Sequence, residues 1–400
     1  MEKPLDGVRI VDMSTHGACP SCGKILADWG AEVIKVEAKS GDAARTSGQS
    51  FGVPSDEGMN PHFDMLNAGK KSIVVDMKTP EGRDIIDQLL TSANALITNF
   101  RTPALVKLKL DYESVSEKFP HLIWGHLTGF GEKGPAANHA GFDTVAYYAR
   151  SGAMIDFSEN GAAPINAPFG VGDLSAGSAF AGGIAAALYQ QQKTGKGQRV
   201  SISLYGQSIW AHGVVMQSIY HGAEYPRTRE NATVPLNNCF RCKDGEWLYM
   251  SVLQYERYFA PFCKLIGRED LIDDPRYNTI EQAKLHNREL IALFDKSFAQ
   301  HTRAEWNLML ESADIAHDNI NHFKDALSDP QALENGFIRP IYYNDGRDSV
   351  IASPPVILGE ADTAEPKAGP RLGENTAEVL RSLHFSEGTI QDYYKREIVK

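Results

Sequence analysis

One aspartate in this sequence stands in a setting suited to nucleophilic chemistry. The pattern around it is Gly170-Val171-Gly172-Asp173-Leu174-Ser175-Ala176-Gly177, which leads directly into an apolar run. It predicts a glycine-rich loop that delivers one carboxylate to the start of a helix built from small residues, because glycine permits sharp bends and close approach. The positive end of a helix dipole favours an ionised carboxylate there. Asp173 is therefore a candidate nucleophile, and the alternative is an aspartate that only caps the helix.

Two closely spaced cysteine pairs are the other candidates for chemistry. Cys19 and Cys22 lie between a strand-like and a helix-like stretch, where a dithiol redox motif would have a lowered thiol pKa. Cys239 and Cys242 form the second pair, and together the four thiols could be zinc ligands. Zinc ribbons, however, place their pairs roughly 15 to 20 residues apart, whereas these pairs are far apart in the sequence. We therefore predict no metal site and keep a dithiol redox protein as an alternative.

Composition restricts the class of protein. The chain has 400 residues, of which 42% are hydrophobic, and a formal net charge of −11. A chain of this length exceeds what one core usually organises, so two domains are expected. The acidic balance argues against a nucleic-acid partner. The first residues lack a signal-like pattern, no apolar segment approaches the ~18 residues that span a bilayer, and five cysteines favour reduced thiols. We expect a cytoplasmic protein without a membrane partner.

The first third of the chain alternates between two kinds of segment. Valine- and isoleucine-rich strands are predicted at residues 8–11, 33–36, 72–75, 95–98 and 122–128. Helices are predicted at residues 21–29 and 80–90, so the strands should pair in parallel. Such a sheet binds its ligands in the loops after residues 11, 36, 75 and 98. The first loop has no Gly-x-Gly-x-x-Gly fingerprint, which disfavours an ordinary dinucleotide dehydrogenase.

Several blocks, in order along the chain, resemble the class III CoA-transferases of the CaiB/BaiF type. They include Pro4–Asp12, Gly30–Glu37, Lys71–Ile73, Asp76–Arg83, Thr128–Pro135, Gly172-Asp173, Lys193–Gln198 and Leu372–Thr376. The resemblance implies an α/β fold with a Rossmann-like large domain, a parallel sheet and a smaller α+β domain, in an interlocked ring homodimer. We expect residues 1–225 to form the N-terminal part of the large CoA-binding domain, 226–330 the small domain, and 331–400 a linker and C-terminal segment returning to the large domain.

The resemblance also implies a covalent mechanism. In the family, the aspartate that matches Asp173 attacks an acyl-CoA thioester to give a mixed anhydride, and the released thiolate then forms an aspartyl-CoA thioester. No tightly bound cofactor is implied, since the CoA thioester is a substrate. Covalent catalysis keeps the energy of the thioester bond and divides a difficult exchange into steps. We expect backbone amides of the Gly170–Gly172 and Gly177 region to stabilise the oxyanions.

Contacts to CoA are assigned by position in the family's motifs. The candidates are Thr15, His16, Lys39, Lys70, Lys71, Asn99, Phe100 and Lys107. Asp143 matches a family position near the reaction centre. For each lysine the alternative is an ordinary solvated side chain.

Departures from the family's patterns narrow the substrate. The racemase branch carries a histidine base where this chain has Phe142, and the formyl-CoA transferase branch carries a run of glycines that is absent between Arg227 and Trp247. Racemisation and oxalate are therefore disfavoured, although an acyl-CoA racemase or epimerase of the same fold and a non-catalytic binding module remain alternatives. Segments 98–105, 110–113, 141–143 and 149–150 resemble the branch acting on 2-hydroxy acids from amino-acid fermentation, such as phenyllactate or 2-hydroxyisocaproate.

This branch implies further expectations about substrate and partners. An acyl-CoA and a small carboxylic acid would bind, and a downstream 2-hydroxyacyl-CoA dehydratase would be a partner. Met154, Trp210, Met216 and Tyr220 are candidates for the acyl pocket, with ordinary core packing as the alternative. Cys19 and Cys22 fall in a loop that the family uses near CoA, and we expect them to pack rather than react.

Overall fold

The computed structural model describes residues 3–56, 58–358 and 366–400, and the chain forms two compact units. Unit 1 comprises the residues up to 153 together with 166–217 and 331–400, and unit 2 comprises 154–165 and 218–330. Segment 154–165, which the sequence analysis placed in the large domain, thus belongs to the second unit.

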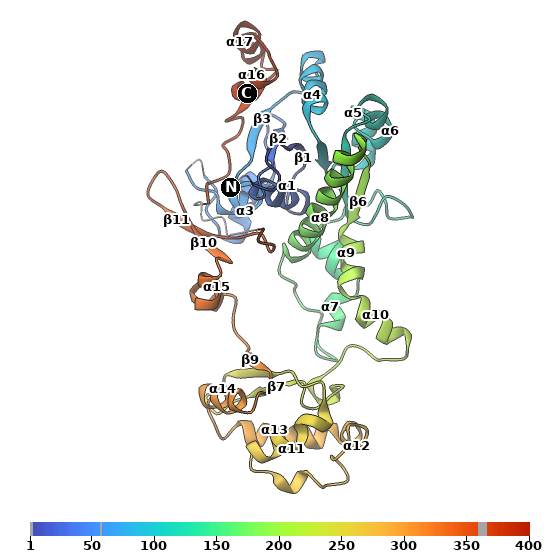
Figure 1. The fold of residues 1–400 in the computed structure, drawn as a ribbon, viewed down its shortest axis with the longest axis vertical. Helices are drawn as coiled ribbons and strands as arrows, with labels where there is room; N and C mark the ends of the chain where they lie inside the picture. The colour runs from blue at the N-terminus through green and yellow to red at the C-terminus, as the bar shows by residue number, and fades with distance from the viewer. Residues whose placement is uncertain (1–2, 57, 359–365) are drawn as a thin grey trace. The chain divides into compact units, whose positions relative to one another are not determined.

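A six-stranded parallel sheet forms the centre of unit 1 (Figure 1). Its strands are β1 (Arg9–Met13), β2 (Glu32–Glu37), β3 (Lys71–Val74), β4 (Ala95–Thr98), β5 (Ile123–Thr128) and β6 (Arg199–Ser203). They are arranged in the order β3-β2-β1-β4-β5-β6, with every pair parallel. This is the doubly wound order, whose switch point lies between the first and fourth strands. The expected parallel α/β sheet is confirmed, and β6 is a strand that the sequence analysis missed.

Helices cover both faces of this sheet. On one face, α4 (Pro80–Ser92), α5 (Thr102–Leu108), α6 (Tyr112–Lys118), α16 (Thr376–Ser382) and α17 (Glu387–Lys395) share one apolar core with the strands. On the other face, α1 (Ala18–Asp28) and α8 (Val171–Thr194) pack together (Figure 1). Gly125 of β5 lets α8 approach closely, since a Cβ there would lie 2.8 Å from the Phe180 ring. Helices α1 and α8 therefore lie next to the carboxyl ends of β1 and β4, where the loops after these strands begin.

The two helices next to the site differ from expectation. Helix α1 begins at Ala18 rather than at residue 21, so Cys19 and Cys22 lie within its first turns. Helix α8 has 24 residues and, of the helices that the structure describes, is the one long and apolar enough to cross a membrane by length and composition. The expectation that no apolar segment approaches that length is wrong. In this fold, however, its small residues serve close packing against α1 and β5.

The remaining elements of unit 1 are short. They are α2 (Ala44–Ser47), the 3-10 helix η1 (Gly48–Phe51), α3 (Pro61–Asn67), the π-helix η2 (Asp143–Ala149), α9 (Leu204–Ala211), α15 (Pro330–Glu334), β10 (Ile338–Tyr342) and β11 (Asp348–Ala352). Helix α7 (Ala153–Asp156), α10 (Gly213–Tyr220) and α15 each include residues of both units. Strands β10 and β11 form an antiparallel hairpin.

Unit 2 is a small mixed domain with its own core. Its antiparallel sheet consists of β7 (Asn238–Arg241), β8 (Trp247–Met250) and β9 (His317–Asn319). They are arranged in the order β7-β8-β9. Its helices are η3 (Arg229–Asn231), α11 (Tyr255–Leu265), η4 (Glu269–Leu271), α12 (Ile280–Leu285), α13 (Asn287–Phe298), α14 (Arg303–Ser312) and η5 (Asp325–Ser328). Aromatic side chains such as Phe262 and Phe298 fill the centre of this unit.

Candidate active site

Asp173 lies in the first turn of α8 but does not cap it. The N-cap residue is Gly170, with φ of 89°, and no side chain accepts a capping hydrogen bond there. A left-handed backbone of this kind favours glycine. The reading of Asp173 as a plain helix cap is therefore wrong. Its half-buried carboxylate makes no hydrogen bond or ion pair with any residue that the structure describes.

The start of α1 faces Asp173. A Cβ on Gly17, the N-cap of α1, would overlap Oδ2 of Asp173. Farther along, Gly177 of α8 packs against Ser21 and lies so close that a Cβ would be 2.7 Å from the Ala18 carbonyl oxygen. The amides in the first turn of a helix have no acceptor within that helix, and α1 has no capping side chain. The Asp173 carboxylate is thus placed beside the positive ends of two helices.

Asp143 holds the loop from which α8 begins. Its Oδ2 accepts a hydrogen bond from the Gly170 amide, and a Cβ on Gly172 would overlap its Oδ1. The residue is 5% exposed, and Oδ1 has no hydrogen-bond partner among the residues that the structure describes. Asp143 is therefore positioned to support the nucleophile's loop from within.

This arrangement overturns one expectation about the oxyanions. The Gly170 amide is bonded to Asp143, and the Gly172 amide faces the same carboxylate closely enough to lower its pKa. Gly177 lies buried within α8, against Ser21. The predicted oxyanion donors in the Gly170–Gly172 and Gly177 region are consequently directed elsewhere. The first-turn amides of α1 are the donors that remain next to Asp173.

Burial and a neighbouring charge set the protonation of the nucleophile. Burial, and secondarily the negative charge of Asp143, raise the pKa of Asp173 to about 7. Burial also raises the pKa of Asp143, against the opposing effect of the Gly170 and Gly172 amides. Two carboxyl groups so placed resist simultaneous ionisation. A pKa near neutrality in a glycine-lined corner is typical of a functional carboxyl group.

The predicted residues Thr15, Asn99 and Phe100 join the loops at the switch point of the sheet. The Thr15 amide donates to Oδ1 of Asn99 at 3.0 Å, and Nδ2 of Asn99 donates to the Thr15 carbonyl at 2.7 Å. Phe100 is half-buried, and its carbonyl is 2.9 Å from Nε2 of the buried His126. These residues brace the loops after β1 and β4, which lie where a doubly wound fold binds its ligands.

His16 is exposed beside Gly17, with a left-handed φ of 64°. Its amide donates to the buried Oδ1 of Asp42 at 3.0 Å, and its ring meets Phe142 edge-on with 5.3 Å between centroids. The hydrogen bond to Asp42 therefore fixes the backbone of His16, and the imidazole lies exposed beside Gly17.

The four predicted lysines lie in different environments. Lys70 is buried, and its Nζ donates to Asp12 and to the Pro20 carbonyl, both at 2.7 Å, and to Asn67 at 2.8 Å. Lys71 pairs with Glu32 and Glu378, and Lys39 with Glu397, whereas Lys107 is exposed on α5. The burial of Lys70 and its pairing with Asp12 argue against direct contact with CoA.

The cysteine pairs do not support thiol chemistry. Cys19 and Cys22 are fully buried in α1, and burial raises the pKa of both thiols, with the Asp12 charge adding to this at each. A redox motif would need a lowered thiol pKa, so the raised pKa values disfavour the dithiol alternative, and the burial of both side chains agrees with the expectation that they pack rather than react. Cys239 and Cys242 belong to unit 2, whereas Cys19 and Cys22 belong to unit 1.

The acyl-pocket candidates are not core residues. Trp210 is 81% exposed and Tyr220 is 87% exposed, so core packing is excluded for both within this chain. Met154 and Met216 are half-buried. Sequence analysis missed Gly17 and three aromatic residues near the start of α8, namely Phe51, His62 and Phe169. A lone glycine and scattered rings carry no signal until the fold brings them together.

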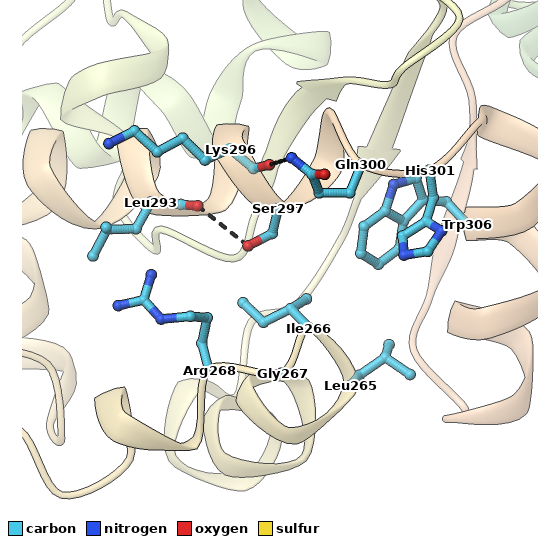
Figure 2. A pocket seen from close by; sticks show the side chains of 10 residues that line it. All are labelled: Leu265, Ile266, Gly267, Arg268, Leu293, Lys296, Ser297, Gln300, His301 and Trp306. Carbon is cyan, nitrogen blue, oxygen red and sulfur yellow. Dashed lines mark hydrogen bonds between the residues drawn. The ribbon is translucent and has the colours of Figure 1, made fainter.

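A separate pocket of about 440 Å³ lies in unit 2 (Figure 2). Its lining residues are Leu265, Ile266, Gly267, Arg268, Leu293, Lys296, Ser297, Gln300, His301 and Trp306. Arg268 is paired with Asp270 at 2.7 Å, and the Trp306 indole donates to the Phe298 carbonyl at 2.9 Å. None of the predicted site residues lines this pocket, so we do not assign the acyl-transfer chemistry to it.

Comparisons with known proteins agree along the whole chain. The model of CoA-transferase family III matches residues 5–376. The chain is 37% identical over 396 residues to the (R)-2-hydroxy-4-methylpentanoate CoA-transferase of Clostridioides difficile, covering 99% of each protein. It is 35% identical over 395 residues to the cinnamoyl-CoA:phenyllactate CoA-transferase of Clostridium sporogenes, covering 98% of this chain and 96% of that protein. A crystal structure of a CaiB/BaiF family protein from Brucella suis, 28% identical, aligns with a TM-score of 0.81 over 96% of this chain and all of that one.

Proposed function

The chain belongs to CoA-transferase family III, and from this premise we propose that it transfers CoA from an acyl-CoA to a 2-hydroxy carboxylic acid through covalent adducts of Asp173. The observation that carries the proposal is the Asp173 carboxylate itself. Among the residues that the structure describes, it has no hydrogen-bond or ion-pair partner. It lies beside two helix N-termini, and its pKa of about 7 allows both an ionised nucleophile and a protonated resting form near neutrality.

The first half of the reaction forms a CoA adduct. An oxygen of ionised Asp173 attacks the thioester carbonyl, the carbon–sulfur bond breaks, and CoA leaves as the thiolate. The product is a mixed anhydride between Asp173 and the acyl group. The thiolate then attacks the aspartyl carbonyl and expels the donor's carboxylate, which leaves Asp173 as a CoA thioester.

The second half repeats these steps in reverse with the acceptor. The acceptor carboxylate attacks the aspartyl thioester and releases the thiolate, and the thiolate attacks the acceptor's acyl carbon to give the new acyl-CoA and free Asp173. Each addition places negative charge on a former carbonyl oxygen. The first-turn amides of α1, next to Gly17, are suited to bind that oxygen because they point out of the helix N-terminus.

The acceptor class is supported by the two relatives named above. Their names give (R)-2-hydroxy-4-methylpentanoate and phenyllactate, which are both 2-hydroxy acids with an apolar side chain. The product would then be an (R)-2-hydroxyacyl-CoA, the substrate for a dehydratase that acts downstream in amino-acid fermentation. We place this chemistry in the cytoplasm. Phe142 is 55% exposed beside the site and has no group able to act as a base, which disfavours a racemase.

We further propose that the active form is a homodimer. The exposed apolar side chains of unit 1 include Tyr189 of α8, Trp210 of α9 and Val214 of α10, which are 62%, 81% and 77% exposed. Patches of this kind mark surfaces that another chain covers. Sedimentation of the purified protein should give twice the mass of the chain, and a monomer that retains full activity would refute this part.

Trapping of the adduct tests the proposal directly. The protein is incubated with acetyl-CoA, butyryl-CoA or cinnamoyl-CoA, quenched with hydroxylamine, and mapped by peptide mass spectrometry. A hydroxamate on Asp173 is expected with at least one thioester. The matched control is Asp84→Asn, an exposed carboxylate on α4, which should leave the label unchanged. A protein that binds CoA but gives no label on Asp173 with any thioester would refute the covalent mechanism.

A further inference from the structure

Five aromatic side chains gather around the approach to Asp173. We call this group the aromatic collar, and it consists of His16, Phe51, His62, Phe142 and Phe169. They come from the β1–α1 loop, from η1, from α3 and from the residues just before η2 and α8. All belong to unit 1, although they are distant from one another in the sequence.

The tightest contact in the collar joins Phe51 and Phe169. Their ring centroids are 3.7 Å apart with an interplanar angle of 15°, so the rings are stacked. His62 lies 5.6 Å from Phe51 and 6.1 Å from Phe169, centroid to centroid. Yet Phe51 remains 44% exposed and Phe169 48% exposed. The stack therefore presents a rigid apolar surface outward, which is the form that ligand-recognising surfaces take.

The collar adjoins the nucleophile on two sides. Phe169 immediately precedes Gly170, the N-cap of α8, and Leu174 packs against Phe63 and Leu66 of α3, the helix that carries His62. On the other side, His16 immediately precedes Gly17 and contacts Phe142, the residue before Asp143. The two sets of rings are thus carried by the chain segments that adjoin Asp173 on its two sides.

The cations of this region are already neutralised. Arg45 pairs with Glu37 at 2.7 Å and lies over the Phe63 ring, 3.9 Å from its centroid. Lys35 and Lys70 are buried and paired with Asp42 and Asp12. Burial lowers the pKa of His62; the charge of Asp42 opposes this shift and His16 adds to it. Among the described residues, a second carboxylate on an acceptor would therefore meet aromatic rings, while Arg45, Lys35 and Lys70 are already paired with carboxylates.

We propose that the Phe51–Phe169 stack receives the side chain of the acceptor acid and makes the enzyme prefer 2-hydroxy acids with an apolar side chain over those with a second carboxylate. This inference rests on the proposed function, and it assigns the selection to two residues. An apolar side chain would cover the exposed ring surface, whereas a charged one would lose water without gaining a partner.

Acceptors of matched chemistry test the inference. The wild-type protein, Phe51→Ala and Phe169→Ala are assayed with butyryl-CoA or cinnamoyl-CoA as donor, and new thioesters are measured by liquid chromatography and mass spectrometry. The acceptors are phenyllactate, 2-hydroxy-4-methylpentanoate, 2-hydroxyglutarate and glycolate. We expect each variant to lower kcat/KM for the two apolar acids by ~10- to 100-fold and for glycolate by less than ~3-fold, the range that lost apolar contacts produce.

Two further variants separate recognition from folding. Phe51→Leu keeps an apolar surface and should recover most of the activity on 2-hydroxy-4-methylpentanoate. Tyr342→Ala removes a ring that is 62% exposed on β10 and should leave all four acceptors unchanged. An equal loss for glycolate and the apolar acids, no loss for any, or a wild-type preference for 2-hydroxyglutarate would each overturn the inference.

The hydroxamate label keeps this failure distinct from failure of the proposed function. If Asp173 is labelled but the acceptor pattern does not depend on Phe51 and Phe169, the transferase mechanism stands and the collar has no part in selection. If Asp173 is not labelled by any thioester, the mechanism itself is wrong and the acceptor inference falls with it.

Discussion

Carboxylates of unit 1 that adjoin the β1–α1 loop have two opposite kinds of partner. Below the loop, Asp12 and Asp42 are paired with Lys70 and Lys35, at 2.7 and 2.8 Å. Burial alone would raise the pKa of Asp12, but the charges of Lys70 and Lys35 lower it. At the surface of the site, Asp173 has another carboxylate as its neighbour, and its pKa is raised to about 7.

The difference separates a structural role from a chemical one. The ion-paired cluster is linked to the loop through the Ser14 carbonyl, which accepts from Lys35 at 2.9 Å, and through the His16 amide, which donates to Asp42. It therefore fixes the backbone that leads to Gly17. Within the described part of the chain no cation pairs with Asp173, as the proposed attack on an acyl group requires. The ion pairs of Asp12 and Asp42 thus hold the loop next to Asp173 in place, while Asp173 itself makes no ion pair among the described residues.

The largest expected effect comes from removing the unpaired carboxylate. Asp173→Asn retains the shape of the side chain but cannot form an anhydride, so we expect transfer activity to fall by ~10⁴-fold or more, as for other covalent nucleophiles. The measurement is steady-state transfer from cinnamoyl-CoA to phenyllactate, with the urea unfolding midpoint as a check on the fold. Residual activity within tenfold of the wild type would place the chemistry on another residue.

The next effect is on stability, from breaking the paired cluster. Lys70→Met leaves the buried charge of Asp12 without its ion-pair partner, and we expect the free energy of unfolding to fall by about 3–5 kcal/mol. Lys71→Met is the matched control at the next position. Lys71 is about one-third exposed and paired with surface carboxylates, so its loss should cost about 0–1 kcal/mol. Urea unfolding at one protein concentration measures both, and equal effects would contradict the contrast.

A third prediction concerns the distance between α1 and the nucleophile. Gly17 has φ of −101° and ψ of −64°, which alanine also adopts, so Gly17→Ala adds only a methyl group that overlaps Asp173 Oδ2. Displacing the reacting oxygen should reduce kcat by about 10²-fold. The control is Gly182→Ala, a position in α8 with open space around it. If both variants have wild-type kcat, α1 does not approach the nucleophile as described.

Sequence reasoning located the parallel sheet and Asp173 but not the surroundings that give Asp173 its properties. Five strands were recognisable because buried parallel strands are continuous runs of valine and isoleucine. Strand β6 was missed because Arg199–Ser203 alternates with polar residues at the sheet edge and is mostly unburied. The start of α1 was placed too late because Pro20 reads as a boundary, although proline fits the first turn of a helix.

The remaining errors arose from contacts between distant parts of the chain. Lysines are solvated by default, so nothing in the sequence showed that Lys70 would be buried against Asp12. The glycines around residue 170 suggested free amides, but Asp143, the first residue of η2, accepts a hydrogen bond from the Gly170 amide. Cys19 and Cys22, by contrast, were expected to pack rather than react, and both are buried in α1. Local pattern thus singled out Asp173 as the candidate nucleophile, and tertiary packing decided its charge and its neighbours.

The smallest effect is expected from Asp143→Asn, because this substitution removes a negative charge next to Asp173 without removing a hydrogen bond. Asp143→Asn keeps an oxygen to accept from the Gly170 amide but removes the negative charge that helps raise the pKa of Asp173. Transfer requires ionised Asp173, so the rate should rise with pH through a midpoint near 7 in the wild type. In the variant this midpoint should fall by about one pH unit, or about 1.4 kcal/mol.

The free energy of unfolding should depend on pH for the same reason. A carboxyl group whose pKa is raised on folding binds its proton more tightly in the native state, so its contribution to stability becomes less favourable as pH rises from about 4 to about 7. Asp143→Asn should weaken that fall in unfolding free energy, relative to the wild type. A variant with lower kcat but an unmoved midpoint would mean that Asp143 only supports the loop, and that burial alone sets the protonation of the nucleophile.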